Sequence, residues 1–241
     1  MQLYSQLAKW WPLLSPQEDY EEEGLLYSSL ILNCLNDWES FLELGCGSGF
    51  LASYFPHSLR KVMVDSSAEM LRHCEQANPT AQCELGDMRS LRLGEQFDAV
   101  MVHDALMYLT THEDLLACLQ TAADHCRPGG VVLLLPDVVR ERFEEGNTLL
   151  AGRDTEGASV RLMEWHWDPD RKDCTFRVEF SLLVRDKEEV RSHHETHTMG
   201  LFDQSTWEAA VKSVGLILED VEIPPGLQVG EIFLARKPPV S

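Results

Sequence analysis

The sequence predicts an α/β fold with a doubly wound, mostly parallel sheet and a small inserted antiparallel sheet. Short apolar runs alternate with helical segments from residue 40 onward, which is typical of a sheet covered by helices on both faces. The run Val131–Leu135 has no polar alternation, as expected for a strand buried on both faces. Between about residues 158 and 200, apolar and polar residues alternate with a period of two, which indicates antiparallel strands.

The first half of the chain is expected to supply five core strands. After an N-terminal helical stretch, these strands are Ser40–Gly45, Leu59–Asp65, a run ending in Cys83–Asp87, Phe97–His103 and Val131–Leu135. Helices are expected over Ser48–Phe55, from a capping box at Ser66–Glu69 and from another at Thr110–Glu113. A turn is expected at Arg127–Gly130, before the fifth strand.

The second half is expected to hold the insertion and then close the core. Inserted strands are expected over Arg161–Trp167, Thr175–Phe180 and Val190–Met199, with a turn at Asp168–Arg171. A helix capped by Ser205–Glu208 and ending at Gly215 is followed by antiparallel closing strands, Leu216–Ile223 and Glu231–Ala235. The predicted organisation is an N-terminal helical segment (1–39), a core (40–137 and 201–241) and an inserted β segment (138–200).

Composition limits the partners that the protein can have. The 241 residues include 20 Lys and Arg against 40 Asp and Glu, a formal charge of −20, without a basic patch. This charge repels phosphates, so we expect neither a nucleic-acid nor an anionic-membrane partner. The start of the chain has no signal-peptide pattern, no apolar run approaches the roughly 20 residues of a membrane span, and the seven cysteines form no C-x-x-C pair. These features predict a soluble cytoplasmic protein with reduced thiols.

The segment Leu42–Gly49, with sequence LELGCGSG, is the most informative motif. Its glycines at positions 45, 47 and 49 allow a tight turn and close approach of a ligand. The spacing differs from the G-x-G-x-x-G of dinucleotide sites, and Glu43 would oppose a pyrophosphate but suits an ammonium or sulfonium group. Asp65, 20 residues after Gly45, can accept hydrogen bonds from ribose hydroxyls. A nucleoside with positive charge and no phosphate predicts S-adenosylmethionine as the cofactor.

From residue 40 to 136 the chain resembles the class I S-adenosylmethionine-dependent methyltransferases. The resemblance rests on LELGCGSG, the DSSAEML run from Asp65, GDM at Gly86, FDAV at Phe97 and RPGG at Arg127. It implies a Rossmann-like, seven-stranded methyltransferase sheet. It also implies that the cofactor is held by the glycine loop around its methionine part, by residues 65 and 66 at the ribose, and by residues 70, 87 and 88 at the adenine. The implied cofactor residues are Glu43, Gly45, Cys46, Gly47, Gly49, Asp65, Ser66, Met70, Asp87, Met88 and His103, although His103 could equally be a structural histidine.

A narrower resemblance covers the second half. Ser192–Phe202, Trp207–Ala210 and Val214–Leu216 resemble N-methyltransferases that dimethylate amino groups of nucleotide-linked deoxysugars in macrolide pathways. This resemblance implies that segment 1–39 closes the site and that segment 138–200 forms a substrate lid. It implies that Tyr4 and Tyr20 help to bind the substrate. Trp11, in a segment without a counterpart in these relatives, could pack on an apolar substrate or in the core, and Tyr108 is a further candidate substrate residue. Tyr108 falls about where these relatives carry a histidine within a serine-rich stretch, whereas the chain here has the sequence HDALMYL.

The sequence therefore predicts methyl transfer to a small molecule, with an amine nitrogen favoured and an amino sugar among the acceptors. An amine must lose a proton before transfer, and a hydroxyl needs a base. Tyr108, His103 and His197 are the candidates for orienting or deprotonating the acceptor, and Tyr108 and His197 are predicted as the catalytic residues. The alternatives are small-molecule O-methylation, a nicotinamide-dependent oxidoreductase, and an inactive cofactor-binding partner subunit. The protein is expected to be a monomer or homodimer.

A metal site is also conceivable from the histidine run. His193, Glu195 and His197 share one face of an expected strand and could ligate zinc. A polar ladder beside the substrate cavity explains the same pattern, and methyl transfer needs no metal. We therefore expect no metal.

Overall fold

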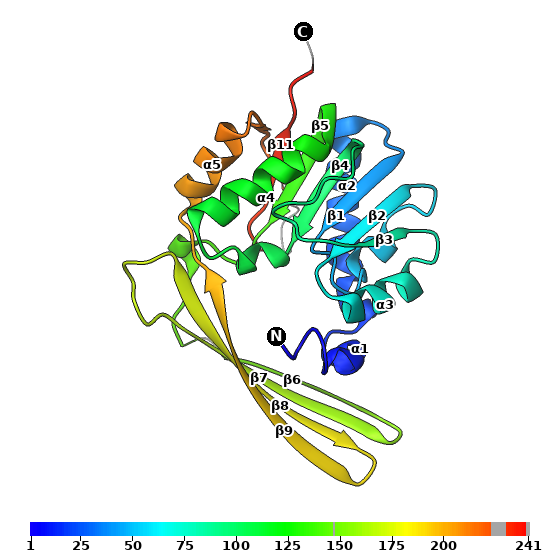
Figure 1. Cartoon of the computed structure of the whole chain (residues 1–241), viewed down its shortest axis with the longest axis vertical. Coiled ribbons are helices and arrows are strands. Elements are labelled where there is room, and N and C mark those ends of the chain that lie inside the picture. Colours follow the sequence, from blue (N-terminus) through cyan, green and yellow to red (C-terminus); the bar gives the residue numbers. More distant parts are fainter. Residues whose placement is uncertain (147, 223–229, 240–241) are drawn as a thin grey trace.

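The computed structural model describes residues 1–146, 148–222 and 230–239. It contains a seven-stranded sheet and a separate four-stranded antiparallel sheet (Figure 1). The strands of the larger sheet are β1 (Ser40–Leu44), β2 (Arg60–Asp65), β3 (Gln82–Leu85), β4 (Phe97–His103), β5 (Cys126–Leu135), β10 (Ile217–Leu218) and β11 (Phe233–Arg236). Those of the smaller sheet are β6 (Thr148–Thr155), β7 (Ala158–Trp167), β8 (Thr175–Asp186) and β9 (Glu189–Gly200).

The strand order of the larger sheet is β10-β11-β5-β4-β1-β2-β3. The strands from β1 to β5 pair in parallel, and β11 runs antiparallel to β5. Because β10 is antiparallel to β11, β11 alone runs against the direction of the sheet. The carboxyl ends of β1, β2, β4 and β5 therefore lie along one edge, where open α/β sheets bind ligands.

Helices cover both faces of the larger sheet, as the apolar strands require. The helices are α1 (Trp11–Leu14), α2 (Glu21–Leu35), α3 (Ala68–Ala77), α4 (His112–His125) and α5 (Gln204–Ser213). Short 3₁₀ turns are η1 (Ala8–Trp10), η2 (Gln17–Tyr20), η3 (Leu51–Tyr54), η4 (Ala105–Tyr108) and η5 (Arg140–Arg142). Side chains of α4 and α5 pack in one apolar cluster with Val100 and Val102 of β4, whereas α2 packs with Met101 on the opposite face. The predicted doubly wound α/β fold is confirmed.

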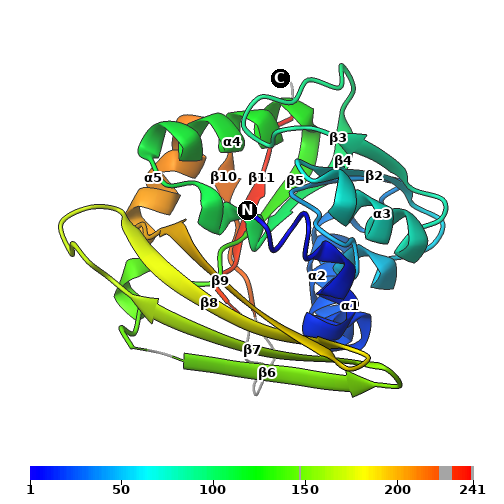
Figure 2. The ribbon, with the colours of Figure 1, turned by 60° about the horizontal axis from the view of Figure 1, so that its bottom comes forward.

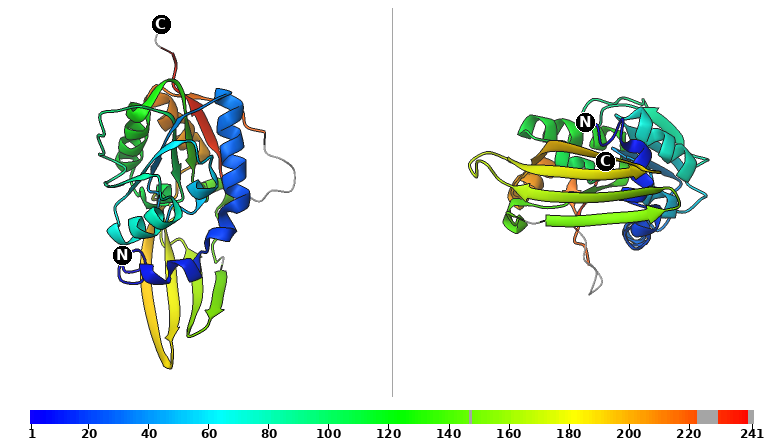
Figure 3. Two further views of the ribbon diagram at one scale, coloured as in Figure 1. Left: turned by 90° about the vertical axis from the view of Figure 1, so that its right-hand side faces the viewer. Right: turned by 90° about the horizontal axis from the view of Figure 1, so that it is seen from below.

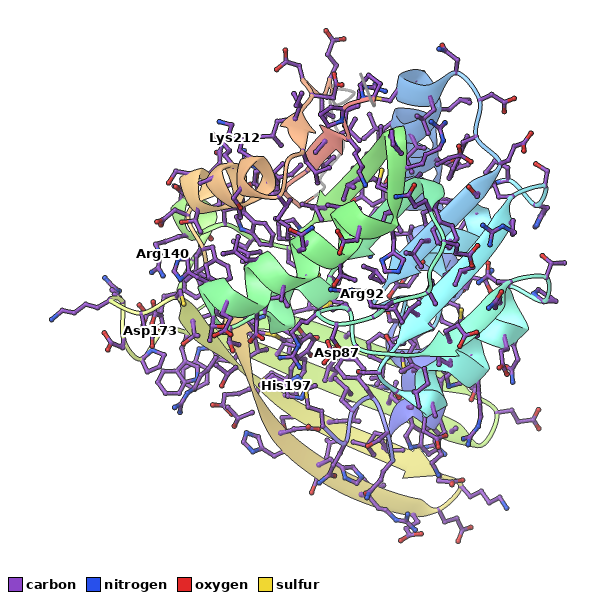
Figure 4. The ribbon with its side chains drawn as sticks, turned by 45° about the horizontal axis from the view of Figure 1, so that its top comes forward. Asp87, Arg92, Arg140, Asp173, His197 and Lys212 are labelled. Atoms are coloured by element: carbon purple, nitrogen blue, oxygen red, sulfur yellow. The ribbon has the colours of Figure 1, made fainter. Side chains whose placement is uncertain are left out.

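The smaller sheet lies beyond the carboxyl edge of the larger one, and the N-terminal segment runs between the two (Figures 1, 2 and 3). Its inner face packs against Leu3 and Leu7 of that segment and against Met107 of η4. Arg140 holds the junction between the sheets, since its Nη2 donates to the carbonyl oxygens of Leu201, at 2.8 Å, and Asp173 (Figure 4). The edge of the core, the N-terminal segment and the inserted sheet thus surround one space.

Several expected boundaries are wrong by small amounts. The caps of α3 and α4 are Ser67 and Thr111, one residue later than expected, because their side-chain oxygens accept the backbone N–H groups of Met70 and Asp114. The N-cap of α5 is Asp203, and the expected capping residue Ser205 lies inside the helix.

Two loops and one strand also differ from expectation. The expected turn Arg127–Gly130 lies within β5 as an irregularity, because Gly130 accepts the backbone N–H of Lys237 at 3.0 Å. The expected helix Ser48–Phe55 is only the turn η3, between Gly49 with its positive φ and Pro56. Strand β6 was not expected, and Ile223, the end of one expected closing strand, lies outside the described residues.

Candidate active site

A cavity of about 1150 Å³ occupies the space between the core edge, the N-terminal segment and the four-stranded sheet. Ligand cavities for a single small molecule commonly measure about 300–1,000 Å³, so this one has room for two. Its wall on the core side contains most of the residues expected to bind the cofactor: Glu43, Gly45, Cys46, Gly47, Asp65, Ser66, Met70, Asp87, Met88 and His103. Its opposite wall contains side chains of the inserted sheet.

The glycine loop after β1 forms one side of the core wall. Gly45 has φ +72°, and a Cβ there would lie 2.3 Å from the Cβ of Ala105. Gly47 has φ +54°, and its N–H donates to Oδ2 of Asp65 at 2.8 Å. Gly49 does not border the cavity. A Cβ there would meet Cys74 at 2.5 Å, so Gly49 allows α3 to pack against the loop.

Asp65 ends β2 and is fixed by backbone donors. The N–H of Ser67 donates to its Oδ1 at 2.8 Å, and the N–H of Gly47 occupies its Oδ2. Burial raises the pKa of this carboxyl, and these backbone hydrogen bonds oppose the rise. Asp65 borders the cavity, and a carboxylate has about four acceptor sites, so it can still accept a hydrogen bond from a ligand.

Glu43 is the most unusual group of the wall. Its side chain belongs to a residue only 2% exposed, and its Oε2 has no hydrogen-bond partner among the described residues. Burial raises its pKa to about 8, although the charge of His103 opposes that rise. A buried carboxylate without a partner is costly, so this position favours a cationic ligand group.

Asp87 and Met88 border the cavity beyond β3. Arg89 engages Asp87 through Nε and Nη2, and its hydrogen bonds lower the pKa of that carboxyl. Arg89 also donates to Asp114 at 2.8 Å. Asp87 is therefore held as a charged acceptor at the rim of the cavity.

His103 and Asp104 follow each other at the carboxyl end of β4. The Nε2 of His103 lies 2.9 Å from Oδ1 of Asp104 and 3.7 Å from Oε2 of Glu23. Burial disfavours the imidazolium, but these carboxylates outweigh that effect and raise the pKa of His103 to about 9. The sequence left two roles open for His103, a cofactor residue or a structural histidine. The structure agrees with both, because His103 borders the cavity and is also ion-paired within the protein.

Tyr108 links the cavity to a buried histidine. Its hydroxyl oxygen lies 2.8 Å from the hydroxyl of Tyr4 and 2.8 Å from Nδ1 of His197. Burial lowers the pKa of His197, so its ring is neutral near pH 7. His197 is 2% exposed and does not border the cavity. It belongs to β9 and lies on the side of the inserted sheet near the core (Figure 4).

Residues of the N-terminal segment border this side of the cavity. Glu195 of β9 accepts the backbone N–H groups of Gln2 and Leu3 at 2.8–3.0 Å. Its Oε1 also lies 3.1 Å from Nε2 of His197, although that nitrogen makes no hydrogen bond. The expected substrate residues Tyr4, Trp11 and Tyr20 all border the cavity. Among the residues with described coordinates, no cluster of His, Cys, Asp and Glu side chains could hold a metal ion.

Sequence reasoning missed five acidic residues that border the cavity: Glu69, Asp104, Asp137, Glu144 and Glu164. Asp104 and Asp137 follow the neighbouring strands β4 and β5, where His103 pairs with Leu135. Glu164 comes from β7 of the inserted sheet. The two aspartates could have been found, because the carboxyl ends of adjacent parallel strands meet at one edge. Glu164 had no comparable signal, since its position depends on how the inserted sheet folds over the core.

Comparisons with known proteins agree with this site. Residues 41–130 match the family model of a methyltransferase domain. The dTDP-3-amino-3,4,6-trideoxy-alpha-D-glucopyranose N,N-dimethyltransferase of Streptomyces venezuelae is 31% identical over 219 residues, which cover 88% of this chain and 91% of that protein. The crystal structure of Streptomyces venezuelae DesVI matches with a TM-score of 0.80 and 29% identity, covering 92% of each chain. The structure of S-adenosylmethionine-bound CalS10, an amino pentose methyltransferase from Micromonospora echinaspora, matches with a TM-score of 0.78 and 25% identity over 90% of this chain and 91% of that one.

The fold and the cavity thus define a methyltransferase-type α/β protein. The chain belongs to the S-adenosylmethionine-dependent methyltransferases, in the family that contains the sugar N,N-dimethyltransferases. Both resemblances found in the sequence are confirmed, and S-adenosylmethionine is the cofactor of the family. The alternative of a nicotinamide-dependent oxidoreductase is wrong. Within the described part of the chain, no helix is both long and apolar enough to span a bilayer.

Proposed function

We propose that this enzyme methylates the amino nitrogen of a small molecule, with an amino sugar as the first acceptor to test. One observation carries the proposal. A single cavity joins the glycine-loop wall to a second wall that contains Tyr108, Asp104 and the face of the inserted sheet. The similar proteins named above are N,N-dimethyltransferases of amino sugars or an amino pentose methyltransferase, which supports nitrogen as the methylated atom.

The residues of the core wall fit the cofactor. In this proposal the unpartnered Oε2 of Glu43 faces its ammonium group, and Asp65 with Ser66 accepts from its ribose. Gly45, Cys46 and Gly47 leave the loop backbone open to its methionine part, Met70 packs on its adenine, and Asp87 and Met88 border that ring. When bound, S-adenosylmethionine supplies a methyl group activated on its sulfonium, which a free nitrogen lone pair can take in line.

The protein's own residues position the acceptor and remove its proton. We assign Tyr108 to the acceptor nitrogen, because its hydroxyl borders the cavity. The Tyr108 hydroxyl donates to Tyr4, and the neutral ring of His197 lies 2.8 Å from the same oxygen. When that hydroxyl turns toward Nδ1 of His197, the ring can take up a proton passed through Tyr108. Tyr4 bonds Tyr108 from the other side, so segment 1–39 orders the acceptor wall as it closes the cavity. Segment 138–200 acts as the lid over the acceptor.

We propose the cytoplasm as the place of action, and the thiols support this proposal. All seven cysteines are free, which supports a reducing cytoplasm as the place of action. A secreted protein with this many cysteines would be expected to pair some of them.

The test is a transfer assay with S-adenosylmethionine labelled in its methyl group. We expect the label on nitrogen when a 3-amino-3,6-dideoxyglucose derivative is the acceptor, and the position is read by NMR of the product. A label on oxygen would support the alternative of O-methylation. Binding of S-adenosylmethionine without transfer to any amine or hydroxyl acceptor would support the alternative of an inactive partner subunit.

A further inference from the structure

Three cysteine side chains meet beside the glycine loop and form a thiol cluster. Cys46 belongs to the loop, Cys74 to α3 and Cys83 to β3. The Sγ atom of Cys74 lies 3.9 Å from that of Cys46 and 3.7 Å from that of Cys83. All three thiols are free. Methyl transfer as proposed above gives no role to Cys74 or Cys83, so the cluster is a set of nucleophiles without an assigned function.

The glycine loop and α3 approach each other closely at this cluster. A Cβ at Gly49 would lie 2.5 Å from Sγ and 3.1 Å from Cβ of Cys74. The side-chain amide of Asn78 donates to the carbonyl oxygen of Gly49 at 2.7 Å. Cysteines joined by a disulfide have Cβ atoms about 3.8 Å apart and Sγ atoms about 2 Å apart. Because the two backbones are already this close, side-chain rotation with a small shift of the loop can bring Cys46 and Cys74 to bonding distance.

A small oxidant can reach the cluster by two routes. Cys74 itself is fully buried. Its neighbour Cys46 borders the cavity, and its neighbour Cys83 is partly exposed on β3, the edge strand of the larger sheet. A molecule as small as a peroxide can therefore enter from the cavity or from the edge of the sheet.

Cys74 is the thiol of the cluster that ionises most readily. Hydrogen bonds from Cys46 and Cys83 lower the pKa of Cys74, although burial opposes that effect. Burial raises the pKa of the other two thiols. Oxidants react with the thiolate rather than with the thiol, so we expect Cys74 to react first and a neighbouring thiol to complete the disulfide.

We infer that the thiol cluster is a peroxide-sensitive modification site, in which a disulfide between Cys46 and Cys74 forms and lowers the affinity for the cofactor. This inference rests on the placement of the cofactor at the glycine loop in the proposed function. Cys46 stands between Gly45 and Gly47, which border the cavity, so a bond from Cys46 to α3 displaces the loop backbone there. Cytosolic disulfides are usually transient and redox-sensing, which agrees with thiols that are free at rest.

The oxidation needs one peroxide for each disulfide. The Cys74 thiolate attacks one oxygen of hydrogen peroxide, the O–O bond breaks, and the hydroxide that leaves takes up the proton that Cys74 had lost. The sulfur of Cys46 then attacks the sulfenic acid on Cys74, the S–O bond breaks, and the oxygen leaves as water with the thiol proton of Cys46. Two thiols are oxidised by two electrons in total, and the peroxide is reduced to two waters. An external dithiol reverses the reaction by thiol–disulfide exchange.

The test treats the purified wild-type enzyme with hydrogen peroxide and then alkylates the remaining thiols. The disulfide is located by mass spectrometry after digestion with trypsin and a glutamate-specific protease, because Glu75 separates Cys74 from Cys83. We expect a link between Cys46 and Cys74. The Kd of S-adenosylmethionine, measured by calorimetry, should rise about tenfold or more and return to its starting value after dithiothreitol. Absence of this link, or a link between Cys74 and Cys83 with an unchanged Kd, would overturn the inference.

Two variants separate the cluster from other targets of peroxide. Cys74→Ala should bind S-adenosylmethionine within twofold of the wild type and keep that affinity after peroxide; Cys74→Ser, which retains a polar atom, should behave in the same way. The matched control is Cys34→Ala, which removes a partly buried thiol of α2 that makes no hydrogen bond to another thiol among the described residues. It should lose affinity on oxidation as the wild type does.

Oxidation of methionine is distinguished by the same measurements. Met70 and Met88 border the cavity, and their sulfoxides would persist after dithiothreitol. A loss of affinity that persists after dithiothreitol, or that occurs equally in Cys74→Ala, would overturn the inference. The proposed function is tested separately by the transfer assay on the reduced enzyme. Failure of N-methylation there would overturn that function and leave the location of the disulfide unaffected.

Discussion

The two halves of the cavity are built in different ways. The cofactor half comes mainly from two short stretches, 42–49 and 65–70, with Asp87 and Met88 added at the adenine end. It uses backbone N–H groups and positive φ values at glycines. The acceptor half combines Tyr4, Asp104, Tyr108, Asp137 and Glu164, which come from four separate stretches of the chain. Local backbone geometry therefore specifies the cofactor, whereas the packing of an insertion and an N-terminal segment specifies the acceptor.

The largest effect is expected from a substitution that impairs the acceptor half of the cavity and leaves the cofactor half intact. Tyr108→Phe removes the hydroxyl that joins the cavity to Tyr4 and His197. We expect kcat to fall about a hundredfold, the range of a lost proton-transfer group. The Kd of S-adenosylmethionine, measured by calorimetry, should stay unchanged. A wild-type kcat would remove Tyr108 from the chemistry.

A substitution at Gly45 is expected to disturb the glycine loop of the cofactor half and to destabilise the protein. Gly45→Ala places a Cβ 2.3 Å from that of Ala105 and forces alanine to φ +72°. We expect a loss of about 3 kcal/mol in the free energy of unfolding, measured with urea. The double variant with Ala105→Gly should recover the part due to the clash but not the part due to φ. Full stability of the single variant would show that the loop adapts.

A smaller loss is expected from Asp65→Ala. The variant removes the acceptor of two backbone donors and of the ligand hydroxyls assigned to it. We expect the Kd of S-adenosylmethionine to rise about tenfold or more, which corresponds to one or two hydrogen bonds. The KM of the amine should remain within twofold. Unchanged cofactor affinity would contradict the ribose assignment.

The protonation of Glu43 should make the affinity for the cofactor depend on pH, which gives a further test of the cofactor half. Because the pKa of Glu43 is about 8, the free enzyme carries this carboxyl protonated at neutral pH. A cationic ligand group beside it favours the ionised form, so binding releases a proton and cofactor affinity should rise with pH up to about 8. Between pH 7 and 8 we expect a change of about fivefold at most, measured by calorimetry. Glu43→Gln should bind with an affinity independent of pH in this range.

Stability should show the opposite dependence on pH. The Glu43 carboxyl stays protonated in the folded protein up to about pH 8, whereas in the unfolded chain it ionises near its ordinary pKa. The unfolded state then binds fewer protons, so this group lowers the free energy of unfolding as pH rises from about 4.5 to 8. The Glu43→Gln variant should lose that part of the pH dependence.

The same division explains what the sequence could predict. The core strands, the glycine loop and Asp65 lie in contiguous motifs, and the parallel sheet brings them together by its topology alone. Adjacent identical residues, Ser66–Ser67 and Thr110–Thr111, hid the true caps, because the choice depends on which hydroxyl reaches the third N–H. Strand β6 is mostly exposed and lies at the sheet edge, so it has no clear alternation to detect.

The placement of His197 needed the fold. On the sequence it is one of three histidines in a strand, and its position behind Tyr108 follows from the register of β8 and β9 over the cavity. Gly49 likewise shares the loop motif, yet it serves the packing of α3 rather than the cavity wall.

The most direct test of the divided cavity is the affinity of Asp104→Asn for S-adenosylmethionine, measured by calorimetry beside Asp65→Ala. If the two halves act separately, Asp104→Asn binds the cofactor as the wild type does, and Asp65→Ala binds it about tenfold more weakly. A comparable loss of cofactor affinity in both variants would contradict the account, because Asp104 would then belong to the cofactor half.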